Sequence, residues 1–382
     1  RAPRVPGSLN PSCTDRRTMP ISCLIVGGGL IGRSVAYYLS RFTSHILVID
    51  EDPVEVLSPP TRASLGVLTR PTTSLDALSH FYRVSHALYQ SLAAELIQET
   101  GIDVGWTACG GVEVAYDDQE STTLHDHVQR LQQRGAHCQW LTSEQVAARE
   151  PDLVSAPSAA CLWPADHQVD PQRLSRALWS GAEQRGARYQ TGCVRGFDMA
   201  GNPAALLTTG ERLEADAIIL CAGAHSHGLL ADLGLPSSVV RAAPGQSLRL
   251  QTSATVSGIV HWAGYHMVPT PEGTIAVGAT NEPVVGEGIP AATSEEARVQ
   301  LMGVVERLLG TGGTVVAHEG GLRPKPRRGR PVIDRIADAD IFLATGHYKN
   351  GVLMAPATGQ ALARWIVEGE PGIDLSPFRI RR

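Results

Sequence analysis

The stretch Gly27-Gly28-Gly29-Leu30-Ile31-Gly32 directly follows the apolar run 21–26 and opens a helical pattern of apolar residues. It fits the pattern G-x-G-x-x-G at a turn from a strand into a helix. In this pattern the first glycine permits the tight turn, the second lets the backbone approach a pyrophosphate, and the third lets the helix pack on the strand. The pyrophosphate then lies at the positive N-terminal end of the helix. The stretch therefore predicts a dinucleotide-binding unit.

A second apolar run, 46–49, ends in Asp50. The dinucleotide fingerprint places an acidic residue about 20 positions after the glycines, where its carboxylate accepts hydrogen bonds from the adenosine ribose. We therefore predict that the adenosine half of the cofactor contacts the glycine turn and Asp50. The residues concerned are Gly27, Gly29, Leu30, Ile31, Gly32 and Asp50.

Length and composition limit the classes of protein to which the chain belongs. At 382 residues it exceeds the usual size of a single hydrophobic core, so two domains are expected. The formal charge of −5 argues against nucleic acid or an anionic membrane as the main partner. The chain has no uninterrupted run of 18 or more apolar residues, so the sequence indicates no transmembrane helix. The cysteines are scattered, without a C-x-x-C pair, which favours reduced thiols in a cytoplasmic protein. Composition leaves open whether the chain forms a homo-oligomer.

Periodicity and capping signals predict the main elements. Apolar residues recur every three or four positions over 78–96, which predicts a long helix ending near Gly101. Further helices are expected after the capping residues Thr142, Asp170 and Thr293. Thr293 would form a capping box with Glu296, three positions later. Strands are expected at 217–222, repeatedly over 240–280 and at 341–345. The last of these leads through a glycine-rich loop to a helix with Pro356 at its start.

This order predicts an α/β chain with a discontinuous nucleotide-binding domain and an inserted antiparallel-sheet domain that binds substrate. We assign residues 19–80, 150–235 and 320–382 to the first domain, and residues 81–149 and 236–319 to the second. Residues 1–18 contain arginines and prolines but no apolar core of a secretory signal. We expect a disordered extension there, with an organelle transit peptide as the alternative.

Only one dinucleotide fingerprint is present, so the sequence indicates no separate nicotinamide site. The single bound dinucleotide would then take electrons from the substrate directly, which favours a flavin. Gly321-Leu322-Arg323-Pro324 and the segment 346–359, with the sequence GHYKNGVLMAPATG, resemble the carboxyl-terminal signature of flavin-dependent glycine oxidases. These enzymes belong to the D-amino-acid oxidase family and serve thiamine biosynthesis in many bacteria. The chain also resembles this family at residues 27–32, 167–171, 220–223 and 268–269.

The resemblance implies a Rossmann-like FAD-binding domain and further contacts to the flavin. No cysteine adjoins Lys325, where covalently flavinylated relatives carry one, so FAD is expected to be bound noncovalently. The expected flavin contacts are Ser64, Gly66, Gly223, His347, Tyr348, Lys349, Asn350, Gly351 and Val352. No metal is expected, because His125 and His127 lie two positions apart in a helical stretch and face different directions.

Oxidising an amino acid to an imine needs a carboxylate clamp, a neutral amine and stabilisation of negative charge on the reduced flavin. Arg323 suits the clamp because a guanidinium binds a carboxylate bidentately, and the resemblance assigns it this role. Lys349 stands where relatives usually have an arginine, so a second contact to substrate there is a point charge.

The pocket residue near the Val268-Pro269 pair has two candidates. Many relatives have a tyrosine two residues before this pair, where this chain has His266, with Tyr265 one position earlier. A one-residue slip in a strand reverses the face. Either His266 lines the pocket, where a charged imidazole would assist carboxylate binding, or Tyr265 reaches it through a bulge.

The sequence thus predicts an FAD enzyme that oxidises glycine or another small amino acid or amine to the imine. Oxygen is the expected electron acceptor and hydrogen peroxide the second product. One alternative is a dehydrogenase of the same fold that passes electrons to a quinone or carrier. From other classes, a nicotinamide-dependent reductase and a non-catalytic flavin-binding subunit stay open.

Overall fold

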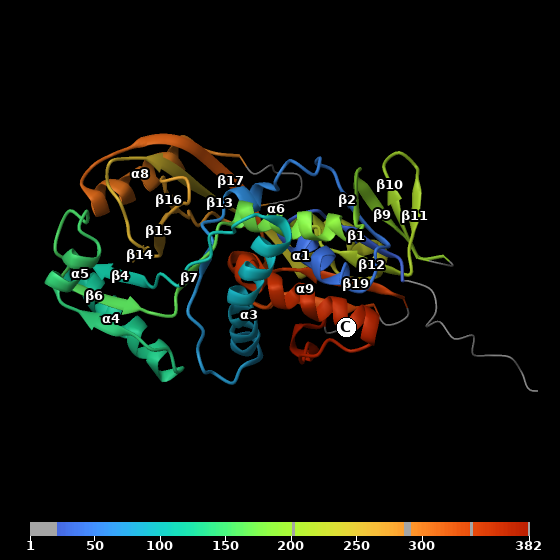
Figure 1. Ribbon diagram of the computed structural model, residues 1–382, viewed down its shortest axis with the longest axis horizontal. Coiled ribbons are helices and arrows are strands. Elements are labelled where there is room, and N and C mark those ends of the chain that lie inside the picture. The colour runs from blue at the N-terminus through green and yellow to red at the C-terminus, as the bar shows by residue number, and fades with distance from the viewer. Residues whose placement is uncertain (1–20, 201–202, 286–291, 337–338, 381–382) are drawn as a thin grey trace, which may run out of the picture.

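The computed structural model describes residues 21–200, 203–285, 292–336 and 339–380. The extension expected at residues 1–18 lies outside these ranges. Two large sheets dominate the described residues, one of six strands and one of eight. Figure 1 shows them toward opposite ends of the molecule, with the long strands β13 (Val240–Gln251) and β17 (Thr314–Pro326) reaching between them. The predicted α/β fold of two domains is confirmed.

The six-stranded sheet carries the glycine turn. Its strands come from both halves of the chain, and all neighbours are parallel except the first pair. The central strands are buried apolar runs, as expected for a parallel sheet covered on both faces. In spatial order the strands are β18 (Val332–Arg335), β19 (Ile341–Thr345), β12 (Ala217–Leu220), β1 (Cys23–Val26), β2 (Ile46–Asp50) and β8 (Arg188–Thr191).

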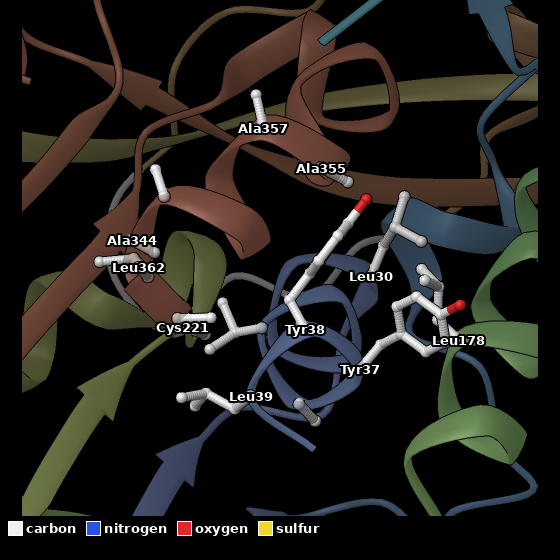
Figure 2. Packing of buried hydrophobic residues seen from close by; sticks show 14 of the residues in the cluster. Leu30, Tyr37, Tyr38, Leu39, Leu178, Cys221, Ala344, Ala355, Ala357 and Leu362 are labelled. Carbon is white, nitrogen blue, oxygen red and sulfur yellow. The ribbon is translucent and has the colours of Figure 1, made fainter. Parts of the chain in front are cut away.

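Helix α1 (Leu30–Leu39) is at the centre of the larger core. It packs against α6 (Pro171–Gln184) and α9 (Gly351–Glu368), and α9 packs in turn against α3 (Ala77–Thr100). Figure 2 shows side chains of α1 surrounded by those of α6, α9 and the ends of two strands. The carboxyl-terminal helix is therefore part of the same core as the amino-terminal glycine turn. The labelled side chains are Leu30, Tyr37, Tyr38, Leu39, Leu178, Cys221, Ala344, Ala355, Ala357 and Leu362.

The eight-stranded sheet is antiparallel except where β14 runs parallel to β4. Helix α8 (Glu295–Leu309) packs on β13 and β16, and helices α4 (Asp118–Gln133) and α5 (Ser143–Arg149) lie at the far end of the sheet (Figure 1). In spatial order the strands are β17, β13, β16 (Ile275–Gly278), β15 (Tyr265–Pro269), β14 (Ile259–Trp262), β4 (Gly111–Ala115), β6 (Ala159–Trp163) and β5 (Gln139–Leu141).

Smaller elements complete the described chain. Two further sheets contain β9 (Val194–Asp198), β10 (Ala204–Leu207) and β11 (Arg212–Glu214), and β3 (Val67–Leu68) with β7 (His167–Gln168). The short α-helices are α2 (Pro59–Arg62) and α7 (Ser226–Leu229). The 3-10 turns are η1 (Gly223–His225), η2 (Ala231–Leu233), η3 (Ser237–Val239), η4 (Tyr348–Asn350) and η5 (Ser376–Phe378). No helix of the described residues combines the length and apolar character needed to cross a membrane.

Most capping predictions are confirmed. Asp170 accepts hydrogen bonds from two backbone N–H groups at the start of α6, Thr142 and Gln145 form a reciprocal capping box, and Gly101 ends α3 in the left-handed conformation. The start of α8 differs, because Ser294 rather than Thr293 accepts the capping hydrogen bond. A serine one position later serves the same purpose, since its hydroxyl reaches the N–H three residues on.

The start of α9 was predicted too late in the chain. The helix begins at Gly351, so Pro356 lies inside it. Proline removes the N–H that would bond to the carbonyl four residues earlier, which here belongs to Val352. That carbonyl instead accepts a hydrogen bond from the Tyr89 hydroxyl of α3. A tertiary contact thus satisfies the group that the proline leaves free, and the helix continues.

The division into domains remains a proposal. Helix α3 packs with α1, α6 and α9, whereas β6 lies in the eight-stranded sheet between β4 and β5. Strand β17 belongs to the same sheet although its end carries Arg323. We therefore propose that α3 belongs to the nucleotide-binding domain, and that β6 and β17 belong to the substrate-binding domain.

Candidate active site

A cavity of about 950 Å³ joins the two halves of the fold. Its wall includes the glycine turn and Asp50 of the six-stranded sheet, together with Arg323 and His266 of the eight-stranded sheet. Residues that are distant in sequence therefore open into one space. The predicted cofactor contacts that line it are Gly27, Gly29, Leu30, Ile31, Asp50, Ser64, Gly66, Gly223, His347, Tyr348, Lys349, Asn350, Gly351 and Val352.

The glycine turn has the geometry that its pattern predicts. Gly27 has a φ of +108°, and a Cβ there would lie 2.6 Å from the carbonyl oxygen of Cys221. A Cβ on Gly32 would lie 1.9 Å from the carbonyl oxygen of Gly27, so this third glycine packs the helix against the turn rather than lining the cavity. A Cβ on Gly29 would meet only Ser58, with the Oγ at 3.5 Å, which is an ordinary contact. The turn thus forms a cradle that fits a pyrophosphate at the start of α1.

Asp50 and a buried arginine hold this turn in place. The Gly28 N–H donates to Asp50 Oδ2 at 2.6 Å. Arg33, which is 1% exposed, donates from Nε to the Gly28 carbonyl at 2.8 Å and from a terminal nitrogen to the Val54 carbonyl at 2.7 Å. Sequence reasoning missed Arg33, because a charged residue in an apolar helix pattern gave no sign of the carbonyl groups that it meets.

The predicted flavin contacts come from loops that approach each other closely. Gly66 has a φ of +74°, and a Cβ there would lie 1.8 Å from the Val169 carbonyl oxygen. Gly223 has a φ of +54°, and its carbonyl accepts a hydrogen bond from Thr345 Oγ1 at 2.8 Å. The structure therefore brings the segments around Ser64, Gly223 and 346–352 to one cavity, in agreement with a bound dinucleotide.

His347 packs beneath the carboxyl-terminal loop. It is 3% exposed, and its Nε2 lies 3.1 Å from Thr358 Oγ1. Burial lowers the pKa of His347 to about 3. The imidazole is therefore neutral in the folded protein at neutral pH.

The buried His347 predicts a pH-dependent stability. An unfolded histidine titrates near 6.5, so below about this pH the unfolded chain binds a proton that the folded chain does not. Stability therefore falls as the pH drops through this window, by up to about 1.4 kcal/mol per pH unit. We expect the Tm of the FAD-loaded protein to fall more steeply below about pH 6.5 in the wild type than in His347→Gln. Parallel Tm profiles for the two proteins would contradict this assignment.

Arg323 lines the same cavity and carries a guanidinium cation. Its terminal nitrogens donate to the carbonyl oxygens of Pro244 at 3.0 Å and Thr280 at 3.1 Å. Gly245 leaves room for the guanidinium, since a Cβ there would lie 2.0 Å from one of its terminal nitrogens. No carboxylate of the described residues lies within ion-pair distance of it. The remaining N–H groups are therefore available to an anionic ligand.

Two lysines add positive charge beside Arg323. The Nζ atoms of Lys325 and Lys349 each lie 5.7 Å from the centre of the Tyr348 ring. Burial lowers the pKa of Lys349, and the neighbouring charges of Arg323 and Lys325 lower it further. Tyr348 itself has a φ of +51°, a conformation that is uncommon for a residue other than glycine. This end of the cavity is suited to a negatively charged group.

The two candidates at the Val268-Pro269 pair lie on opposite faces of β15. His266 lines the cavity. Tyr265 packs with the core under α8, where its hydroxyl contacts Gln300. The structure contains no bulge that would bring Tyr265 to the pocket, because β14 and β15 pair in regular register. Burial, followed by the nearby His261, lowers the pKa of His266 to about 3. The expectation of a charged pocket histidine is therefore wrong.

Sequence reasoning missed three residues behind His266. His261 lies directly opposite His266 in the hairpin, and their Nδ1 atoms are 2.7 Å apart. His261 Nε2 lies 2.8 Å from Asp166 Oδ2, and Asp166 pairs with Arg70 at 2.8 Å. The sequence offered only Gly264 as a turn residue there; in the structure Ala263 and Gly264 both have positive φ and form a tight hairpin turn. It places His261 and His266 side by side.

The histidines at 125 and 127 lie on α4. His125 stacks on Trp140, and His127 Nε2 lies 3.9 Å from a Glu113 carboxylate oxygen and 3.3 Å from Arg70. Within the described residues no group of three or more His, Cys, Asp or Glu side chains could hold a metal ion.

Comparison with known proteins identifies the family. A family model described as FAD dependent oxidoreductase (DAO) matches residues 22–365. The chain belongs to this DAO family. It is therefore an FAD-dependent oxidoreductase.

Similar DAO proteins cover nearly the whole chain. A glycine oxidase of Geobacillus kaustophilus is 29% identical, in an alignment of 374 positions that covers 94% of this chain and 96% of the relative. A solved structure of glycine oxidase from Geobacillus kaustophilus has a TM-score of 0.85 at 26% identity, covering 95% and 98% of the two chains. A bifunctional protein ThiO/ThiG of Trichormus variabilis is 28% identical to this chain. The alignment covers 94% of this chain but 54% of that longer relative.

Proposed function

We propose that this DAO protein oxidises glycine or another small amino acid or amine to the imine. Oxygen would take the electrons and leave as hydrogen peroxide. The similarity to proteins named glycine oxidase over nearly the full chain supports this proposal, and similarity to a ThiO/ThiG protein supports a role in thiamine biosynthesis. We further propose that FAD is held noncovalently.

The observation that carries the proposal is the position of Arg323. Its guanidinium is held by two backbone carbonyls, has no carboxylate partner among the described residues, and opens into the cofactor cavity. A partly buried cation that forms no ion pair favours an anionic ligand, although the charge of Glu282 acts on it from farther away. An amino acid supplies a carboxylate that matches the planar guanidinium fork. The substrate carboxylate would thus be fixed at one end of the cavity.

The proposed roles follow from this anchor. FAD, when bound, supplies the acceptor for the two electrons and the hydrogen of the substrate's Cα–H bond. Arg323 binds the substrate carboxylate and thereby orients the Cα–H bond. Lys349 adds a second cation near the same group, as a point charge rather than a fork. The N-terminal end of α9 at Gly351 places backbone N–H groups where negative charge would be stabilised.

Anaerobic reduction tests the proposed function directly. We expect the purified protein to be yellow, to lose colour after acid precipitation releases the flavin, and to bleach when a substrate is added without oxygen. Glycine, sarcosine, D-alanine and D-proline form a suitable panel. A protein that is reduced by none of them, or that binds NADH and no flavin, would overturn the proposal.

The electron acceptor needs a separate measurement. Oxygen consumption with release of an equal amount of hydrogen peroxide is the result expected of an oxidase. Rapid bleaching without oxygen, followed by slow reoxidation in air and fast reoxidation by a soluble quinone, would instead identify a dehydrogenase.

A further inference from the structure

Two histidines and an aspartate form a hydrogen-bonded chain behind the cavity. His261 and His266 are paired across the hairpin of β14 and β15, with perpendicular rings and 2.7 Å between their Nδ1 atoms. Asp166 Oδ2 lies 2.8 Å from Nε2 of His261 on the other side. His266 lines the cavity, whereas His261 and Asp166 are 5% and 0% exposed. The chain therefore leads from the substrate region into the protein.

The surroundings of Asp166 keep its carboxylate ionised. Arg70 donates to it from its backbone N–H at 2.5 Å and from its guanidinium at 2.8 Å. Burial opposes ionisation, but the hydrogen bond from His261, the charge of Arg70 and the Arg70 backbone hydrogen bond outweigh it and lower the pKa of Asp166. Gly111 makes the contact possible, because a Cβ there would lie 2.5 Å from His261 Nε2 and 2.7 Å from Asp166 Oδ2.

An ionised Asp166 determines where each ring carries its proton. A carboxylate only accepts hydrogen bonds, so His261 must donate from Nε2, and its Nδ1 is then an acceptor in the neutral ring. His266 must therefore donate from Nδ1, which leaves the lone pair of its Nε2 unprotonated. The structure gives this Nε2 no hydrogen-bond partner among the described protein groups. The free lone pair belongs to the ring that lines the cavity.

A substrate amine needs such an acceptor. Alkylammonium groups titrate near 10, so an amino acid arrives protonated at neutral pH. A protonated nitrogen has no lone pair with which to form the C=N bond as the Cα–H bond breaks. One proton must therefore leave the substrate nitrogen first.

We propose that His266 Nε2 accepts this proton and that His261, beside Asp166, stores it. The inference rests on the proposed amine oxidation. The substrate N–H bond breaks and an Nε2–H bond forms on His266. The Nδ1–H proton of His266 then moves to Nδ1 of His261, which becomes an imidazolium paired with the Asp166 carboxylate. One proton enters the pair of rings, one charge is gained, and no electrons are transferred.

The charged groups around the pair favour storage on the inner ring. Lys349 and Arg70 oppose positive charge on His266, whereas Asp166 favours it. Of the two rings, only His261 directly contacts Asp166, so a cation is better placed on His261. A carboxylate oxygen of Glu113 lies 3.4 Å from a guanidinium nitrogen of Arg70 and adds negative charge there. The partly exposed His127 lies beside Glu113, with its Nε2 3.9 Å from the same oxygen. With its pKa at about 3, His266 is neutral in the resting protein, so its lone pair is available across the neutral range.

The pH profile of His266→Gln tests the proposal. Proton transfer by a positioned side chain contributes about 10²–10⁴-fold, so we expect kcat/KM to fall by at least about 10²-fold near neutral pH. The deficit should shrink toward about pH 10, where the substrate amine loses its proton to solvent. Added imidazole should partly restore His266→Ala. His318→Gln, a histidine of the same sheet outside the cavity wall, should behave as the wild type.

Different results overturn different statements. A wild type that oxidises no amine overturns the proposed function and the proton relay together. An active wild type with a His266→Gln deficit that is the same at every pH, or absent, overturns the relay alone.

A second measurement does not depend on turnover. We expect ¹⁵N NMR of the histidine-labelled holoenzyme to show His261 protonated on Nε2 and His266 protonated on Nδ1. Loss of the signals in His261→Gln and His266→Gln assigns them. A His266 ring that carries its proton on Nε2, or on both nitrogens at neutral pH, would overturn the relay.

Discussion

Replacing Arg323 with alanine is expected to weaken substrate binding by about 2–5 kcal/mol, the cost of removing one partner of a buried hydrogen-bonded charge pair. The guanidinium lies between two backbone carbonyls and has no carboxylate partner among the described residues, so a substrate carboxylate is its expected counter-ion. Without the guanidinium, the substrate carboxylate would enter a partly desolvated cavity that lacks the paired N–H donors of the arginine. The measurement is the Kd of a small carboxylic acid, followed by the change in flavin absorbance.

Two further variants separate the charge from the fold. Arg323→Lys keeps the charge but not the planar fork, so its loss of affinity should be smaller than that of the alanine variant. Arg241→Ala removes an exposed arginine from the adjacent strand β13 and should leave the affinity unchanged. An Arg323→Ala protein with normal affinity and normal kcat/KM would reject the clamp.

The features of the fold and of the site that sequence reasoning found are those that depend on local backbone chemistry. The glycine turn, Asp50 and the αL cap of Gly101 each follow from what a residue without a Cβ, or a short acidic side chain, does to nearby backbone. Arg323 was found by resemblance, and no local pattern distinguished it from a surface arginine. Its setting comes from Gly245 on a neighbouring strand and from the carbonyls of Pro244 and Thr280.

The relay behind His266 was beyond sequence reasoning for a different reason. Arg70, Asp166 and His261 lie far apart in the chain, and their contacts form only when three separate segments meet. In the structure the turn at 263–264 brings His261 beside His266, and nothing local in the sequence indicates that Asp166 lies behind them. The start of α9 was misplaced for the same reason, because Tyr89 of α3 satisfies the carbonyl that Pro356 leaves free.

The third glycine of the turn provides the second large effect. In Gly32→Ala the new Cβ would lie 1.9 Å from the Gly27 carbonyl oxygen, a backbone atom that cannot rotate away. Helix α1 would have to move from the turn, disturbing the contacts that Figure 2 shows with α6 and α9. Overpacking of this kind costs about 1–3 kcal/mol and occasionally more. We expect a lower Tm of the FAD-free protein and little flavin retained after gel filtration.

Two control glycines distinguish packing from contact with the cofactor. Gly303→Ala, at an exposed position inside α8 with nothing near the new Cβ, should stabilise the chain by about 0.5–1 kcal/mol. In Gly29→Ala the nearest atom is Ser58 Oγ at 3.5 Å, an ordinary contact, so the FAD-free protein should keep its Tm. It should nevertheless lose affinity for FAD, because the new methyl group projects where the pyrophosphate must approach the backbone. If Gly29→Ala retains FAD as the wild type does, the pyrophosphate does not lie against Gly29. If Gly32→Ala keeps both its Tm and its flavin, the close packing of α1 on the turn does not require this glycine.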